Sequence, residues 1–592
     1  MTSSGIRPPA RQPRSSTPLI ACALLALVAA TLTFNPALGT GGDNAEYLTL
    51  GRAIAQGDGY RMIAEPGAPA ETKRWPGYPV FLAGVMLAVG EDLGLLKVTS
   101  VLCFAGAAVL AWVYLRRQNA RGWWAPAAAV ALFVLNDNVL HYASSLYAEA
   151  LFIVLSLGAL VMLERASDPD ELRQAGWAVG AALLCAAAIY VRPHGLALIP
   201  AAFCFFALRR NWKLAFAAPA VIVVALMPWA WRQVSPSSAG GDTYVTKTLG
   251  TREEDTQGVS EARKYADRIV RNASAQFLSM GQAILARPAH VGFRPVEPSA
   301  PAEVVAASVT DAPEHPVAER AGGGISPGRA SRYLLATLVL IGAVVTWRGA
   351  GSSAHWYLIF TAALLLITPW PRGRYLVPLL PFFGWFLVEA LLWIADRTGR
   401  WIGQPRSQRL GQAGVASACA LALLLTAMTA SQQTIVNLRN RGLPWWAPQR
   451  YASQGLDLAN YMVAAAWVRD NAPADATVIA RKPYLVYWVS GRAAEMVWSE
   501  SVDGSWEGFR AAAARGPVYV IEDAFGKRYD QRAQSQNWWR PALAEHPAQV
   551  EMALETAPPQ VRVWRMLPES LGLHESTVRA ASGDAATGAL GS

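Results

Sequence analysis

The sequence predicts a polytopic α-helical membrane protein with about 11 transmembrane helices and a C-terminal extracytoplasmic α/β domain. The 592-residue chain is 53% hydrophobic and only 16% charged, whereas soluble proteins usually carry about 25% charged residues. The apolar residues are clustered in runs that recur from Pro18 to Ala430, and a transmembrane helix needs roughly 20 of them. These observations exclude a soluble globular enzyme.

The net charge of +10 does not indicate a nucleic-acid partner. The Arg and Lys residues lie mostly in short loops between apolar runs, where they set membrane orientation. Residues 1–17 form a basic cytoplasmic tail, and the first span is too long for a typical signal-peptide core, so we expect it to be retained. The five cysteines all lie within apolar runs, which predicts neither a disulfide framework nor a zinc site.

Residues 18–430 form the predicted transmembrane module. Its expected spans are 18–37, 93–115, 123–141, 146–163, 175–191, 194–208, 213–231, 331–347, 354–370, 375–395 and 411–430. The apolar stretch from Tyr78 to Gly90 rises only about 20 Å as a helix, less than a bilayer core of roughly 30 Å. We therefore place it at the outer interface. With the N-terminus inside, every cytoplasmic loop is then basic.

Three long segments are expected outside: a first outer loop 38–92, a long outer loop 232–330 with a weak helix near 261–284, and residues 431–592. Within the last segment, alternating helices and strands predict an α/β domain at 431–570. Its expected elements are helices at 459–471 and 484–490 and strands at 477–480, 517–521 and 560–565. The Ala, Gly and Ser-rich tail 571–592 is predicted to be disordered.

Charged residues near the outer ends of the spans point to a functional site. Asp43 follows the first span directly, and cations gather in outer turns where membrane orientation does not require them: Lys73, Arg74, Lys97, Arg192, Arg372 and Arg374. Charges near membrane depth usually face a cavity or a partner. Single members of this set could snorkel to lipid headgroups, but the whole set favours an anion site, because Arg binds phosphate through two donors.

Two further carboxylates have two readings each. Glu149 opens an apolar span, where it either caps the helix start or belongs to the site. Glu46 lies one turn after Asp43, which is compatible with a capping box or with a second acid, and the structural reading is favoured.

One carboxylate among several cations suits a particular chemistry. A glycosidase needs a second acid to protonate its leaving group. A sugar phosphate already carries a good leaving group, so cations that hold the phosphate and one base that accepts the proton of a hydroxyl suffice. The pattern therefore predicts glycosyl transfer from a lipid phosphate.

The motifs in this order resemble the GT-C fold glycosyltransferases, in the bacterial branch related to protein O-mannosyltransferases and lipid A aminoarabinose transferases. The resemblance touches most of the chain and rests on Asp43 with Tyr47, Pro76–Pro79, Glu149–Phe152, Arg192–Leu196, Arg374–Pro381, Ala465–Pro473 and Lys482–Trp488. It departs from the aminoarabinose branch in the first loop, and the loop 232–330 has no counterpart. Both departures leave the acceptor open.

The resemblance implies an inverting enzyme of the bacterial inner membrane with a polyprenyl-phosphate sugar donor and a glycan, lipid or protein acceptor. Asp43 would be the general base, and Tyr375 would assist by hydrogen bonding. The donor phosphate would be held by Lys73 or Arg74, Arg192, Arg372 and Arg374. Some relatives bind a divalent metal near the second acidic residue, which here is Glu149, with His141 or His194 as neighbours. We assign no metal ligand, and a divalent metal stays open as a cofactor.

Two other functions compete with this interpretation. An O-antigen ligase or polymerase also acts on polyprenyl-linked glycans, but its key residues would lie in the loop 232–330, which offers scattered Arg residues and His290 and His315. A lipid transporter would be expected to show inverted repeats and charges at the bilayer midplane, and the sequence shows neither.

Overall fold

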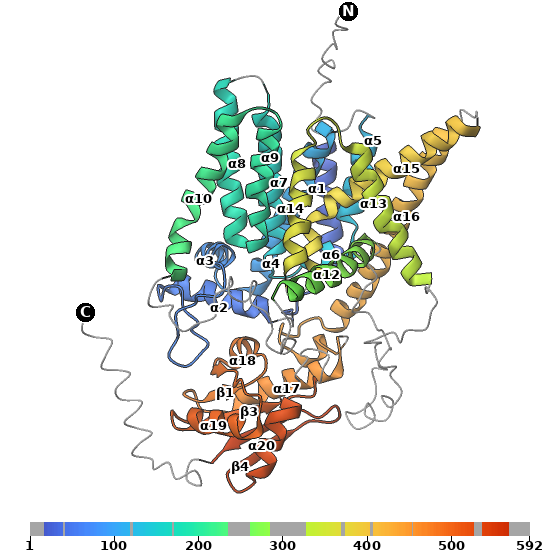
Figure 1. Ribbon diagram of the computed structural model, residues 1–592. Coiled ribbons are helices and arrows are strands. Elements are labelled where there is room, and N and C mark those ends of the chain that lie inside the picture. Colours follow the sequence, from blue (N-terminus) through green and yellow to red (C-terminus); the bar gives the residue numbers. More distant parts are fainter. Residues whose placement is uncertain are drawn as a thin grey trace, which may run out of the picture.

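The protein is a bundle of helices with a small sheet-containing region at one end (Figure 1). The computed structural model describes residues 17–39, 42–118, 122–168, 171–234, 261–284, 327–368, 373–402, 407–452, 454–525 and 535–567. Residues 1–16 of the expected N-terminal tail 1–17, the tail 571–592 and most of the loop 232–330 lie outside these residues.

Six helical segments of the described chain are long and apolar enough to cross a membrane. They are α4 (Leu93–Gln118), α8 (Glu171–Val191), α10 (Trp212–Val234), α13 (Pro327–Thr346), α15 (Leu380–Ile402) with the preceding η5 (Gly373–Leu379), and α16 (Ser407–Arg439). Shorter helices complete the bundle: α1 (Thr17–Leu32), α5 (Trp124–Val134), α6 (Asp137–Ala143), α7 (Glu149–Ala166), α9 (Leu198–Ala207) and α14 (Ser353–Ile367). The chain is a multi-pass membrane protein. Each expected span overlaps one of these helices, while the count of 11 stays a prediction.

Three expected spans are not the continuous α-helices that the sequence suggested. The range 123–141 is divided between α5 and α6, because the Asn136 side chain accepts a hydrogen bond from the Asn138 N–H and caps a new helix. The ranges 194–208 and 375–395 begin as the 3₁₀ helices η1 (Pro193–Ala197) and η5. Proline lacks the N–H that an α-helical ladder requires, and Pro193 and Pro378 lie in these two segments.

Three helices lie at the end of the bundle that faces the sheet: α2 (Asp43–Gln56), α3 (Gly77–Val89) and α12 (Glu261–Ile284) (Figure 1). The predicted short helix at 78–90 is α3, which packs against α2 and α8. A Cβ at Gly77 would lie 2.6 Å from the backbone carbon of Tyr190, so glycine permits this close approach. The weak helix expected near 261–284 is α12, whose Asn272 donates to the carbonyl of Thr368 at 2.7 Å beyond the end of α14.

The C-terminal region contains a five-stranded sheet in the order β2-β1-β3-β5-β4. Strands β2 (Ala493–Glu495), β1 (Thr477–Ile479) and β3 (Val518–Glu522) are parallel, and β5 (Arg562–Met566) and β4 (Val550–Glu555) continue the sheet in antiparallel pairs. The helices are α17 (Leu456–Asn471), α18 (Pro483–Ser490), α19 (Val502–Ala513) and α20 (Arg540–Glu545). The predicted strands at 477–480, 517–521 and 560–565 are confirmed as β1, β3 and β5. The short β2 and the edge strand β4 were not anticipated.

The two faces of this sheet have different neighbours. Because successive strand residues point to opposite faces, Tyr519 and Ile521 of β3 join one apolar cluster, and Val518 and Val520 join another. The first cluster includes residues of α17 and is continuous with the core of the helical bundle. The second is closed by aromatic residues of α19 and its surroundings. The sheet is thus packed onto the bundle by its α17 side.

Candidate active site

Asp43 is the first residue of α2, and Glu46 lies in the same first turn. Helix starts favour negative charge, because their N–H groups point toward it. The preceding Gly42 has φ of 92°, a left-handed conformation that glycine adopts readily. The chain can therefore turn sharply into a helix that lies across the end of the bundle that faces the sheet (Figure 1).

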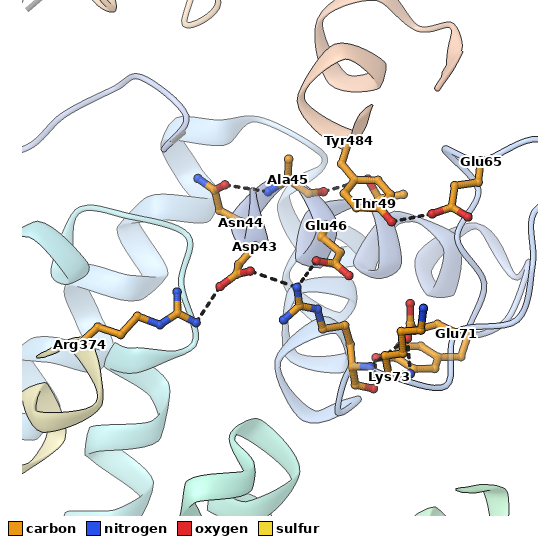
Figure 2. A network of polar contacts seen from close by, with 12 residues as sticks. Asp43, Asn44, Ala45, Glu46, Thr49, Glu65, Glu71, Lys73, Arg374 and Tyr484 are labelled. Carbon is orange, nitrogen blue, oxygen red and sulfur yellow. Dashed lines mark hydrogen bonds and ion pairs between the residues drawn. The ribbon is translucent and has the colours of Figure 1, made fainter. Parts of the chain in front are cut away.

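Each carboxylate oxygen of Asp43 is paired with a different arginine (Figure 2). The Oδ1 atom lies 3.0 Å from Nη2 of Arg74, and the Oδ2 atom lies 2.7 Å from Nη2 of Arg374. The Asp43 side chain is 15% exposed, and those of Arg74 and Arg374 are 33% and 21% exposed. The site is thus largely shielded yet open to solvent at its cations.

Arg74 also contacts Glu46, with Nη2 and Oε2 2.5 Å apart. Burial raises the pKa of the Glu46 carboxyl, although Arg74 opposes this shift. Burial also opposes the charge of Arg74, but Glu46 and Asp43 outweigh it and raise the pKa of Arg74 well above its usual value. Arg74 therefore stays charged and links the two carboxylates of the first turn of α2.

Glu149 continues the network on the other side. It begins α7 and is 1% exposed, and its Oε1 pairs with Nη1 of Arg192 and lies 3.8 Å from Nε of Arg374. Although Glu149 is the first residue of α7, no side-chain cap hydrogen bond forms at this helix start, and its carboxylate joins the charged cluster instead. Three carboxylates and three arginines alternate here: Glu46, Arg74, Asp43, Arg374, Glu149 and Arg192.

Tyr375 forms an aromatic wall beside these arginines. The guanidinium carbons of Arg192 and Arg374 lie 5.6 Å and 5.7 Å from its ring centroid, within the range of cation–π attraction. The ring of His194 lies 4.2 Å from it on the buried side. The Tyr375 ring orients both guanidinium groups and leaves their N–H donors available for hydrogen bonds.

The residues that hold the loop around Arg74 were not predicted from the sequence. Glu71 is buried and accepts from the backbone N–H groups of Lys73 and Arg74, the latter at 2.9 Å. The hydroxyl of Tyr60 donates to the carbonyl oxygen of Arg74 at 3.0 Å. Side chains that bond backbone N–H groups two or three residues ahead are usually Ser, Thr, Asn or Asp, and Glu71 is none of these, so no local signal identified the residue that fixes this loop.

The remaining expected site residues are placed differently. The Lys73 side chain is exposed, so Arg74 is the member of that pair that contacts Asp43. Arg372 lies outside the described residues. Lys97 is buried and donates to the carbonyl oxygens of Asn35 and Ala37 at 2.7 Å and 2.5 Å, so it holds the turn after α1 rather than facing Asp43.

A metal site is not apparent in the part of the chain that the structure describes, since no three His, Cys, Asp or Glu side chains gather there as potential ligands. Glu149, the residue suggested for a metal, is paired with two arginines, whose positive charge opposes a cation beside the same carboxylate. His194 lies against Tyr375. These residues do not fit a metal ion.

A helical membrane bundle with a charged cluster at one end and a small sheet beyond it defines a recognisable class. No protein-family model and no curated protein matches the chain. It is similar to the crystal structure of ArnT from Cupriavidus metallidurans in the apo state, with a TM-score of 0.52 and 14% sequence identity over 93% of this chain and 98% of that one. A second structure of that protein, bound to undecaprenyl phosphate, has a TM-score of 0.49 and 12% identity over 94% and 99%. The chain has the GT-C fold of that lipid A aminoarabinose transferase.

Proposed function

We propose that this protein is an inverting glycosyltransferase of the bacterial inner membrane, which moves a sugar from a polyprenyl-phosphate donor to an acceptor hydroxyl on the outer face. The observation that carries this proposal is the position of Asp43 between the guanidinium groups of Arg74 and Arg374. The carboxylate that would act as the base is thus in direct contact with two guanidinium groups that would bind the phosphate. The C-terminal sheet region would then lie in the periplasm.

The reaction divides between these groups. Asp43 accepts the proton of the acceptor hydroxyl as its oxygen attacks the anomeric carbon from the face opposite the phosphate. The bond between the anomeric carbon and the phosphate oxygen breaks, and its electron pair leaves with the polyprenyl phosphate. The products are an inverted glycoside and the lipid phosphate, with the proton on Asp43.

The arginines stabilise the charge that develops on the leaving phosphate. Arg374 and Arg192 are held by Glu149 and lie against Tyr375, so their donors are oriented before the donor lipid binds. Such preorganised donors often contribute the largest part of catalysis. Arg74, Lys73 and Arg372 would complete the phosphate site, and Tyr375 would add a hydrogen bond.

The pairing of Asp43 with two arginines bears on how the donor enters. A phosphate offers the same guanidinium groups more oxygens than a carboxylate does. Donor binding would therefore compete with Asp43 for Arg74 and Arg374 and release the carboxylate to act as a base. The acceptor could be a glycan, a lipid or a protein, and the sugar a hexose or a pentose.

The test is the variant Asp43→Asn, which keeps the shape of the side chain but removes the base. We expect normal insertion and folding with transfer reduced by about 10²–10⁴-fold, the usual contribution of a general base. Transfer is measured in membranes as formation of the envelope glycolipid that disappears when the gene is deleted. Asp58→Asn is the matched control, because Asp58 is exposed in the loop after α2.

Retained transfer in Asp43→Asn would reject the proposal. Such a result, together with loss of transfer on replacing Arg residues of the loop 232–330, would favour the ligase or polymerase function. Loss of lipid movement without any change in glycolipid chemistry would favour a transporter.

A further inference from the structure

One short helix of the C-terminal region is bonded to both segments that carry the charged site. On α18, the hydroxyl of Tyr484 donates to Oε1 of Glu65 at 2.5 Å, and Nε1 of Trp488 donates to Oγ1 of Thr49 at 3.0 Å. Tyr484 and Trp488 are four residues apart, so they lie on the same face of the helix. Figure 2 shows Tyr484 and Glu65 beside the helix that carries Asp43.

The two acceptors belong to different parts of the site. Thr49 is fully buried in the second turn of α2, on the same helix as Asp43, and also donates to the carbonyl of Ala45 at 2.8 Å. Glu65 lies in the loop that leads to Arg74. The same loop is held a second time, because the N–H of Ala494 donates to the carbonyl of Ala64 at 2.7 Å. The C-terminal region therefore touches the base segment and the arginine segment separately.

Arg52 fixes Trp488 in this position. Its guanidinium carbon lies 3.7 Å from the Trp488 ring centroid, and its Nε and Nη2 atoms bond both oxygens of Glu91 at 2.8 Å and 2.7 Å. A guanidinium held in a bidentate pair has little freedom. The indole is therefore held by two residues of α2, the Thr49 hydroxyl and the Arg52 guanidinium, and Arg52 is tied in turn to Glu91 in the turn before α4.

Tyr484 remains a hydrogen-bond donor throughout the physiological range. Burial, with Glu46 and Glu65 nearby, raises the pKa of its hydroxyl above the usual value. Burial also raises the pKa of the Glu65 carboxyl, and the bond from Tyr484 opposes that shift.

We propose that Tyr484 and Trp488 of the C-terminal region are positioning residues, which hold Asp43 and Arg74 in the correct position relative to each other. This inference rests on the proposed function and extends it, because it makes α18 a part of the catalytic unit. Trp488 acts through Thr49 on the helix of the base, and Tyr484 acts through Glu65 on the loop of the phosphate-binding arginine. Neither side chain touches the reacting atoms.

The geometry predicts a separation of kinetic effects. Trp488→Phe keeps the ring over Arg52 but removes the N–H, so α2 loses a tether and Asp43 is displaced. We expect kcat to fall roughly tenfold, since small misplacements of catalytic groups are costly, while affinity for undecaprenyl phosphate stays within about twofold. Tyr484→Phe releases the Arg74 loop, and we expect that affinity to fall by roughly three- to tenfold, the size of one ordinary hydrogen bond.

The experiment uses the full-length protein in nanodiscs. Undecaprenyl phosphate is the probe for binding, and glycolipid formation from the cell's own lipid extract reports kcat and KM. Trp498→Phe is the control for Trp488, because Trp498 is 68% exposed in the same region. Tyr519→Phe is the control for Tyr484, because it lies in β3 against Trp467. Thermal unfolding reports whether each variant is folded.

A double-mutant cycle separates positioning from general damage. Thr49→Val removes the partner of the Trp488 N–H from the other side. If the two residues act through one bond, Trp488→Phe adds no further loss of kcat to Thr49→Val, whereas independent effects would multiply.

Multiplicative losses, or wild-type kcat and affinity in both α18 variants, would overturn the inference. So would losses that follow a fall in unfolding temperature. If Asp43→Asn is inactive and these variants behave as wild type, the proposed function stands and the positioning role alone is rejected. If Asp43→Asn is active, the proposed function itself fails.

Discussion

The two ends of α7 each carry a buried carboxylate, and they are held in different ways. At one end, Glu164 accepts from the N–H and hydroxyl of Ser353, both at 2.8 Å, and from the hydroxyl of Tyr114 at 3.3 Å. At the other end, Glu149 pairs with arginines, and through Arg374 it is connected to Asp43.

The two ends differ in whether another anion can replace the carboxylate at its hydrogen-bond or ion-pair partners. Glu164 is satisfied by neutral donors on α14 and α4 that are part of the packing, so another anion has no means of replacing it. At the Glu149 end, Glu46, Asp43 and Glu149 share Arg74 and Arg374, which are partly exposed. A guanidinium can release one anion for another without leaving its place. We infer that the Glu164 end of α7 joins helices together. The charged cluster at the Glu149 end would bind the donor phosphate and take part in the transfer reaction.

The sidedness of the two ends gives the largest expected effect, because labelling is all or none. In a background without native cysteines, Asp58→Cys at the Glu149 end should react with a membrane-impermeant thiol reagent in intact spheroplasts. Ser167→Cys, exposed at the Glu164 end, should react only after permeabilisation. Reaction of both cysteines from one side would remove the topology on which the proposed function depends.

The next largest effect concerns Arg374, which contacts Asp43 and Glu149 through different nitrogen atoms. Arg374→Lys keeps the charge but replaces the planar fork with a single ammonium, which cannot hold both carboxylates. We expect transfer to fall about 10²-fold, in line with other misplaced catalytic groups. Steady-state transfer in nanodiscs measures this. Arg469→Lys, in an exposed pair with Asp470, should retain activity.

The Glu164 end should respond in stability instead. Glu164→Gln replaces a carboxylate that accepts three hydrogen bonds with an amide, which is a weaker acceptor. We expect the free energy of unfolding to fall by about 1–3 kcal/mol. Transfer per folded molecule should stay within about twofold of wild type. Thermal unfolding in detergent and activity normalised to folded protein test this pair of expectations. A loss of turnover without a loss of stability would show that the two ends are not divided as described.

The smallest effect is the pH dependence that Glu46 adds. Its folded-state pKa is raised by burial, so the unfolded chain ionises first as pH rises from the ordinary carboxyl range. Its contribution is therefore most favourable at low pH and is lost as pH rises through the raised value. Glu46→Gln should flatten this part of the stability curve. An unchanged slope in unfolding experiments across that range would contradict the buried, shifted carboxyl.

Much of the fold could be predicted from the sequence, because hydrophobic run length and strand alternation are local properties. Most helices of the bundle, with α3, α12, α17 and α18, and strands β1, β3 and β5 were expected near their observed positions, whereas α2, α19 and α20 were not predicted. The interruption at Asn136 and the 3₁₀ segments that contain Pro193 and Pro378 were not predicted, because apolar composition continues through these ranges while capping and proline geometry change the helix. The short β2 was missed because three residues carry too little periodicity.

By itself, the sequence determined that the chain spans a membrane repeatedly and that Asp43 and a set of arginines gather near one surface. The tertiary structure decided which of them meet. Asp43 pairs with Arg374 and Glu149 with Arg192 across long stretches of chain, and α18 reaches α2 from the far C-terminal region. Such contacts depend on how the helices pack, and no local pattern encodes the distance between two helix ends.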